Sequence, residues 1–260
     1  MAILNYQVDQ ISIFMFIFLR VTFILMFLPL FDNTNIPALF KIGLCFAMSV
    51  LFYPVLKFTE IPNFDNGIPL LVGVASEIVM GLGIGLSVKL VFTGIQMGGE
   101  LVGYQMGLSM ANVFDPTTGS QSSIIAEIQY IAAILVFLAI DGHHWFFRAV
   151  ADSFILMPPF GFQVNGALTN EFLSFTVEMF VIAIKISAPI IVALLFTDVS
   201  LGLIARTVPQ MNVFFVAMPV KIIVGVLFIG WLFPLFISYL ISIYSKIGIN
   251  IVTFIKLGST

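Results

Sequence analysis

The chain has 260 residues, of which 60% are apolar and only 9% are charged, and phenylalanine alone occurs 29 times. A water-soluble domain of average composition carries about 25% charged residues, so this chain lacks the polar side chains to cover its own surface in water. Its net charge of −3 and its ten scattered basic residues provide no positive patch, which excludes nucleic acid as a partner.

The apolar runs predict an all-α fold of one or two domains. They lie near residues 10–31, 37–57, 69–97, 122–140, 143–157, 171–197 and 212–257. Four prolines are expected to kink or interrupt the later helices, because proline removes a backbone hydrogen bond, and the last run is expected to be broken: Pro189, Pro209, Pro219 and Pro234. We therefore expect a multi-helix, membrane-protein-like bundle of kinked helices.

Charged residues interrupt almost every run that could cross a bilayer, and only residues 222–245 form a long apolar stretch without one. The interrupting residues are Arg20, Glu77, Lys89, Glu178 and Lys185. In residues 70–95 the Leu, Ile, Val and Phe side chains favour insertion by about 4–8 kcal/mol, whereas Glu77 and Lys89 each oppose it by up to ~3 kcal/mol. Insertion is therefore close to break-even, which predicts that protein partners, more than lipid, surround these charges.

Small residues recur one helical turn apart in two places. The first pair lies on the face that carries Glu77, and the second series leads out of the same helix: Gly81 and Gly85, then Gly99, Gly103, Gly107 and Ala111. Small residues at this spacing let helix backbones approach closely in membrane proteins. Packing within one subunit and packing between subunits fit the pattern equally well.

Glu171, Glu178 and Lys185 are spaced by seven residues and therefore share one helical face. They could form a polar relay, or they could pair with charges on neighbouring subunits. The second interpretation is favoured, because a charged face in an apolar chain more often serves packing.

The stretch 106–123 is too polar to span a membrane. It contains Asp115-Pro116 followed by Thr117, Thr118 and Gly119, which is typical of a turn-rich loop. A loop between membrane-like helices must be buried in protein or line a cavity.

Asp141, His143 and His144 resemble a metal-binding group, but adjacent helical positions point about 100° apart. A helix boundary is the favoured interpretation, and no metal or cofactor is expected. The sequence contains no GxSxG, HExxH or Walker motif, and Gly81–Gly85 lacks the preceding strand of a dinucleotide-binding turn. We therefore do not expect an enzyme.

Taken together, the motifs resemble the FliR family of flagellar export-gate proteins. The strongest resemblance lies in the C-terminal third: Leu201-Gly202-Leu203-Ile204-Ala205-Arg206, Pro209-Gln210-Met211-Asn212-Val213-Phe214, Pro219 and Lys221. Further matches occur in the expected order along the chain: Phe18-Leu19-Arg20 with Pro29, Gly103-Tyr104-Gln105-Met106-Gly107-Leu108-Ser109 with Asp115-Pro116, Gly142-His143-His144 with Ser153 and Pro158, and Pro189.

This resemblance implies a non-enzymatic subunit of the flagellar type III export channel in the bacterial inner membrane, at the flagellar basal body. Its implied partners are FliP, FliQ, FlhB and FlhA-like subunits, and unfolded flagellar proteins are its implied cargo. It also implies a FliP-like part over residues 1–170 and a FliQ-like helical hairpin over residues 171–260. A polytopic secondary transporter or small-solute channel is the alternative, since Glu77 and Lys89 in a glycine-rich helix resemble an intramembrane coupling pair.

Two groups of residues are expected to carry the function. The family's central plug loop corresponds to residues 106–123, with these candidate gate residues: Met106, Gly107, Ser109, Met110, Asn112, Phe114, Asp115, Pro116 and Gly119. The second group is expected to pack against other subunits: Arg20, Glu77, Gly81, Gly85, Lys89, Glu178, Lys185, Arg206, Asn212 and Lys221.

Overall fold

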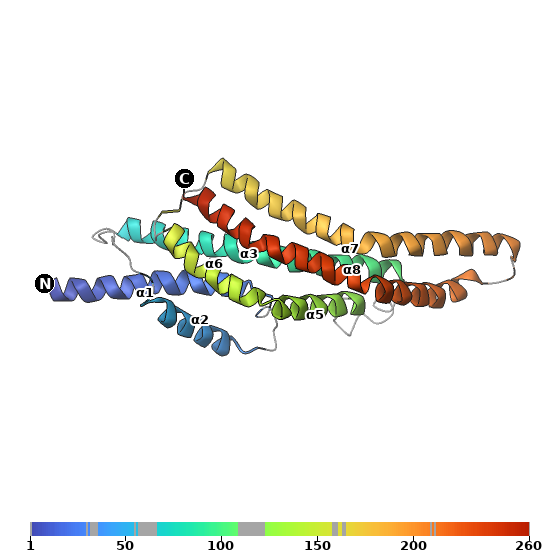
Figure 1. The fold of residues 1–260 in the computed structure, drawn as a ribbon, viewed down its shortest axis with the longest axis horizontal. Coiled ribbons are helices and arrows are strands. Elements are labelled where there is room, and N and C mark those ends of the chain that lie inside the picture. Colours follow the sequence, from blue (N-terminus) through green and yellow to red (C-terminus); the bar gives the residue numbers. More distant parts are fainter. Residues whose placement is uncertain are drawn as a thin grey trace. The chain divides into compact units, whose positions relative to one another are not determined.

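Long helices make up the regular structure of the described part of the chain, which confirms the all-α prediction (Figure 1). The computed structural model describes residues 2–29, 31, 36–54, 56, 67–108, 123–157, 161–162, 165–208, 210 and 212–259. The helices are α1 (Ala2–Met26), α2 (Ala38–Phe52), α3 (Gly67–Gln105), α5 (Ile124–Ala139), α6 (Gly142–Leu156), α7 (Gly166–Thr207) and α8 (Val213–Gly258).

The prolines interrupt the late helices less than the sequence predicted. Pro189 lies inside α7, and both Pro219 and Pro234 lie inside α8. The prediction that the last run is broken was therefore wrong. A proline in a helix interior costs about 3 kcal/mol. The long apolar runs on both sides of each proline form many undisturbed turns, and the helix continues through the proline. Pro209 lies outside the described residues.

Three helices are long and apolar enough to cross a membrane, judged by length and composition: residues 70–105, 166–207 and 215–258. The α5–α6 pair, broken near residue 140, would count as a fourth span if taken together. These helices agree with a membrane-protein-like bundle.

The chain divides into two compact units, and it passes between them within α3, α7 and α8 and between α5 and α6. The first unit contains Met1–Leu90, Asp141–Phe175 and Tyr244–Thr260, and the second contains Val91–Ile140 and Thr176–Ile243. This division follows contacts within the chain. The boundary near residue 170, which rests on family resemblance, falls in the first turns of α7 and stays a prediction.

In the first unit, α1 packs against α2 through aromatic rings and against α3 through glycines. The Phe14 ring meets the Phe46 ring edge-on at 5.4 Å. At the start of α7, the Asn165 side chain accepts a hydrogen bond from the Leu168 N–H and donates one to the Leu257 carbonyl, each at 2.8 Å. Asn165 therefore caps α7 and ties it to the last turn of α8.

In the second unit, α3 lies close against α7 and α5. A Cβ added to Gly94 would stand 2.6 Å from the Met179 carbonyl oxygen, and one added to Gly99 would stand 2.5 Å from the Ala126 Cα. The Phe92 ring packs edge-on against Phe137 at 5.7 Å. Glycine is needed here because the neighbouring backbones leave no room for a side chain.

Candidate functional site

The C-terminal end of α3 is closed by a complete Schellman cap. Gly107 has a positive φ of 84°, a conformation that glycine adopts without strain. The Gly107 N–H donates to the Tyr104 carbonyl at 3.0 Å, and the Leu108 N–H donates to the Gly103 carbonyl at 3.1 Å. These two bonds are the pair that defines the motif. The helix therefore ends at a fixed point, immediately before the predicted plug loop.

The far end of the predicted loop is fixed next to the same turn of α3. Ser123 caps α5 by accepting a hydrogen bond from the Ile125 N–H at 3.3 Å. A Cβ added to Gly103 would collide with the Ser123 side chain, so these two residues are in direct contact. Leu108 and Ser123, which flank the predicted loop, are thus both held at the turn of α3 that contains Gly103.

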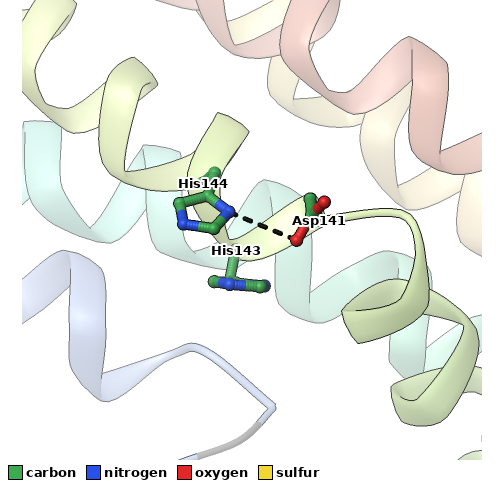
Figure 2. A group of neighbouring side chains, drawn as sticks. All are labelled: Asp141, His143 and His144. Carbon is green, nitrogen blue, oxygen red and sulfur yellow. Dashed lines mark ion pairs between the residues drawn. The ribbon is translucent and has the colours of Figure 1, made fainter.

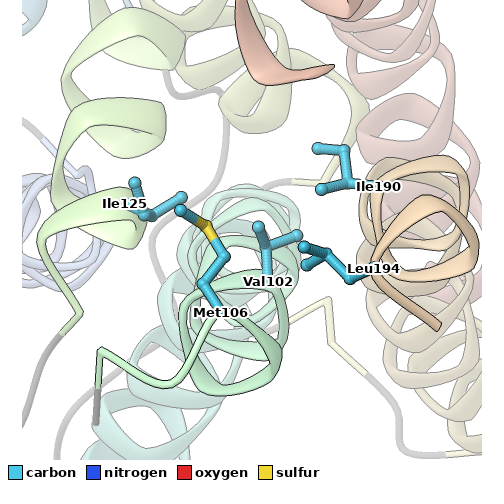
Figure 3. Close-up of a cluster of buried hydrophobic side chains, with 5 residues drawn as sticks. All are labelled: Val102, Met106, Ile125, Ile190 and Leu194. Atoms are coloured by element: carbon cyan, nitrogen blue, oxygen red, sulfur yellow. The ribbon is translucent and has the colours of Figure 1, made fainter. Parts of the chain in front are cut away.

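A cluster of buried apolar side chains lies beneath these two loop ends (Figure 3). Met106 is fully buried and reaches toward Ile125 of α5, while Val102 faces Ile190 and Leu194 of α7. Met106 also crosses α8, because a Cβ added to Gly225 would stand 2.7 Å from its sulfur. A methionine adapts its shape to irregular space. The base of the loop is therefore a packed apolar contact with residues of α3, α5, α7 and α8.

A polar group ties the same end of α3 to α7 and α8. The Lys221 ammonium of α8 lies 2.9 Å from the Asp198 carboxylate of α7, and the Gln105 side-chain amide donates to that carboxylate at 3.2 Å. Asp198 is 39% exposed, so solvent screens the pair and its net contribution is about 0–1 kcal/mol. The group orients the three helices more than it stabilises them.

Seven of the nine predicted gate residues lie outside the described residues: Ser109, Met110, Asn112, Phe114, Asp115, Pro116 and Gly119. Met106 and Gly107 are described, and both lie at the closed base of the loop. The other seven stay predictions.

A second cluster, in the first unit, is a buried network around Arg20. The Arg20 guanidinium forms a bidentate ion pair with Glu77, with Nη2 donating to Oε1 at 2.8 Å, and both side chains are 1% exposed. Nη1 donates to the carbonyls of Ser153 and Met157 at 3.0 Å each, at the end of α6. The guanidinium also lies over the Phe154 ring at 4.3 Å. One side chain thereby joins α1, α3 and α6.

The sequence predicted that Arg20 and Glu77 need protein partners. In the described part of the chain, each of these side chains is paired with residues of the same chain. Gly81 and Gly85 likewise pack internally, since an added Cβ would stand 2.7 Å from Phe23 and 2.8 Å from Phe27, both on α1. The sequence left internal and intersubunit packing open for these glycines. In the structure both glycines pack internally, and their contact with other subunits stays a prediction.

The remaining residues predicted to pack against other subunits are less enclosed. Lys89 lies near the Phe27 ring at 5.6 Å, and Lys185 near the Tyr239 ring at 5.8 Å. Glu178 is half-buried, and Arg206 and Asn212 are exposed. Contact of these residues with other subunits stays a prediction.

Large apolar side chains are exposed along α7 and α8. In α8 only 6% of the most apolar 18-residue window is buried, and Trp231 is 74% exposed. These exposed residues include Val192, Leu195, Phe196, Val199 and Leu203 on α7, and Phe215, Ile223, Leu227 and Leu235 on α8. An exposed apolar surface of this extent marks contact with protein or membrane.

Sequence reasoning missed two residues of the site, Asp198 and Gly225, and it placed Ser123 at the end of the plug stretch without giving it a role. Asp198 could have been found, because it interrupts an apolar helix as Lys221 interrupts the next one. Oppositely charged residues in consecutive apolar helices indicate a cross-helix pair. Gly225 carries no such signal, since its partner Met106 is distant in sequence. Ser123 does carry one, because a serine directly before an apolar run is a typical helix N-cap.

Comparison with known proteins places the chain in a family. The family model described as bacterial export proteins, family 1, matches residues 11–247. The flagellar biosynthetic protein FliR of Pectobacterium carotovorum is 34% identical over 245 residues, covering 93% of this chain and 92% of the relative. The FliR of Bacillus subtilis is 34% identical, covering 85% of this chain and 86% of the relative. The FliR of Escherichia coli is 28% identical, covering 88% of this chain and 87% of the relative.

Proposed function

Since the chain belongs to the FliR family of bacterial export proteins, we propose that it is a core subunit of the flagellar type III protein export gate. It forms, with FliP-type and FliQ-type subunits, the channel through which unfolded flagellar proteins leave the cell, and it lies at the flagellar basal body in the inner membrane beside FlhB-type and FlhA-type subunits. The observation that carries this proposal is the family match over residues 11–247. It involves no catalytic step.

The exposed apolar faces of α7 and α8 support an assembled state. A monomer in water rarely exposes so much contiguous apolar surface, and α8 buries almost none of its most apolar window within its own chain. Helices of partner subunits would cover these faces. The FliQ-like hairpin proposed for residues 171–260 corresponds to this pair of helices.

The closed base of the loop supports a gate formed by residues 106–123. The Schellman cap at Gly107 and the contact between Gly103 and Ser123 hold both ends of the loop together. The loop can then be displaced by passing cargo without unravelling α3 or α5. The base of the loop packs in the apolar cluster around Met106, so in our proposal the barrier to ions depends on the loop itself.

The buried network around Arg20 argues against the transporter alternative. A coupling carboxylate must release its proton or ion during each cycle, whereas Glu77 is held by two hydrogen bonds from Arg20 in a fully buried site. Removing one member of such a pair typically costs about 3–5 kcal/mol. Glu77 is therefore a structural residue in our proposal.

Purification through an affinity tag on this chain tests the assembly. We expect a stable particle that contains several other export-apparatus subunits, identified by mass measurement of the intact complex. A solitary subunit that binds a small solute would favour the transporter and contradict the proposal.

Replacing the loop tests the gate. We compare a chain lacking residues 109–122 with one in which these residues become fourteen glycine and serine residues, which keeps the length but removes the side chains. The deletion should raise ion leakage in whole cells, and the replacement shows whether side chains or mere bulk seal the channel. Unchanged conductance in a deleted but assembled complex would contradict the gate assignment.

A further inference from the structure

Three potential metal ligands converge at the start of α6. Donor atoms of Asp141, His143 and His144 all lie within 4.8 Å of one another, and the His144 Nδ1 lies 3.3 Å from the Asp141 Oδ1 (Figure 2). The two imidazole centroids are 4.2 Å apart. The sequence argument that adjacent helical positions point apart therefore does not describe this turn.

The convergence depends on an unusual backbone conformation at Asp141. Its φ of 57° is the one positive value at a non-glycine residue in the described part of the chain. Aspartate and asparagine enter this left-handed region more readily than other non-glycine residues. Asp141 stands at the N-cap of α6, yet its side chain forms no capping hydrogen bond and faces His144 instead. The Asp141 carboxylate therefore faces an imidazole and not the helix end.

His143 adds a second observation that points to a ligand. Its Nδ1 is buried and has no hydrogen-bond partner in the structure. Leaving a buried polar group unpartnered typically costs about 1–3 kcal/mol. The ion pair of Asp141 and His144 provides no hydrogen-bond partner for this nitrogen. Both side chains of that pair are 70% exposed, so the pair adds little to the stability of the fold.

We propose that Asp141, His143 and His144 bind one divalent transition-metal ion, with Zn²⁺ as the occupant that suits the ligand set best. Two imidazoles and a carboxylate are typical zinc ligands, with bonds of about 2.0–2.2 Å. A tetrahedral ion with such bonds holds its ligand atoms about 3.3–3.5 Å apart, which the Asp141–His144 separation already meets. The ligand atom of His143 lies within 4.8 Å of the other two.

The ion would leave its fourth position open to water or to a ligand from another molecule. Within the chain it would hold the left-handed turn that starts α6. This inference does not rest on the proposed export function.

The composition of the chain makes the test specific. His143 and His144 are its only two histidines, and its single cysteine, Cys45, is buried. The full-length chain is purified in detergent through a tag without histidine, stripped with a chelator and titrated with Zn²⁺. We expect one equivalent to remain bound after dialysis. In His144→Asn and Asp141→Asn, which alter exposed side chains, the affinity should fall about tenfold or more.

A matched control separates the site from general binding to carboxylates. Glu127→Gln removes an exposed carboxylate from the first turn of α5, and it should leave Zn²⁺ binding unchanged. Adventitious binding only, seen as equal Zn²⁺ retention in His144→Asn and the natural chain, would overturn the proposal. No retained Zn²⁺ in the natural chain would overturn it as well.

A spectroscopic measurement avoids any folding defect caused by a variant. With ¹⁵N-labelled histidine, the natural chain gives signals from two imidazoles alone, and Zn²⁺ should shift a ring nitrogen of each. A shift in one ring only, or in neither, would show that the two histidines do not share an ion.

Discussion

Helices α3 and α8 are similarly apolar, yet they are used in opposite ways. In α3, 61% of the most apolar 18-residue window is buried within the chain, against 6% in α8. Some of their glycines reflect the difference, although Gly225 of α8 also packs closely, against Met106. An added Cβ on Gly81, Gly94 or Gly99 of α3 would stand within 2.7 Å of a neighbouring helix, whereas one on Gly230 or Gly248 of α8 would meet nothing within 4 Å.

The same contrast holds for their charged residues. Glu77 of α3 is fully buried against Arg20, whereas Lys221 of α8 forms a half-buried pair with Asp198 near solvent. Hydropathy therefore identifies both helices as membrane-like but does not tell which surface covers them. Close contacts at several glycines and a fully buried ion pair mark the helix that its own chain encloses, whereas α8 has open glycines and a partly exposed ion pair.

Breaking the ion pair of α3 should have the largest effect on the stability of the chain. Arg20→Met leaves the Glu77 carboxylate buried without its partner, so the free energy of unfolding should fall by about 3–5 kcal/mol. The double variant Arg20→Met with Glu77→Leu should recover part of this loss, since no charge then remains buried. Thermal unfolding in one detergent, followed by circular dichroism, measures both. Equal losses in the single and double variants would contradict the role given to the pair.

Adding one methyl group at matched glycines tests the difference in packing. Gly94→Ala in α3 forces the Met179 carbonyl away and should destabilise the chain by about 1–3 kcal/mol. Gly230→Ala in α8 meets open space and should be neutral or stabilising by up to about 1 kcal/mol, because alanine favours the helix. The unfolding midpoints of the two purified variants measure both effects. A similar loss of stability at both positions would contradict the difference in packing.

The cap at the end of α3 should be worth less. Gly107→Ala places a side chain on a residue with a φ of 84°, which should cost about 1–2 kcal/mol. Gly107→Asn should cost less, because asparagine tolerates the left-handed conformation better. Unfolding of both variants under the same conditions measures the difference. If alanine and asparagine behave alike, the positive φ is not what this position requires.

The sequence predicted the helices well because apolar runs and prolines are local signals, but it could not pair distant residues. It ended the third run near residue 97, just before Gly98-Gly99, although α3 continues to Gln105. Those glycines are instead where α3 approaches α7 and α5. Likewise, Arg20 and Glu77 were recognised as charges that need partners. Their mutual pairing across 57 positions depends on packing that no local pattern encodes.

The exposed face of α8 provides the smallest expected effect on the chain itself. Trp231 is 74% exposed, so Trp231→Ala should change the free energy of unfolding of the isolated chain by no more than about 0.5 kcal/mol. If a partner covers this face, the same variant should weaken assembly markedly, because tryptophan is among the residues that dominate interface energies. Yield of the intact particle, relative to the yield of free chain, separates the two effects. A variant that assembles normally would mean that lipid, and not protein, covers α8 at this position.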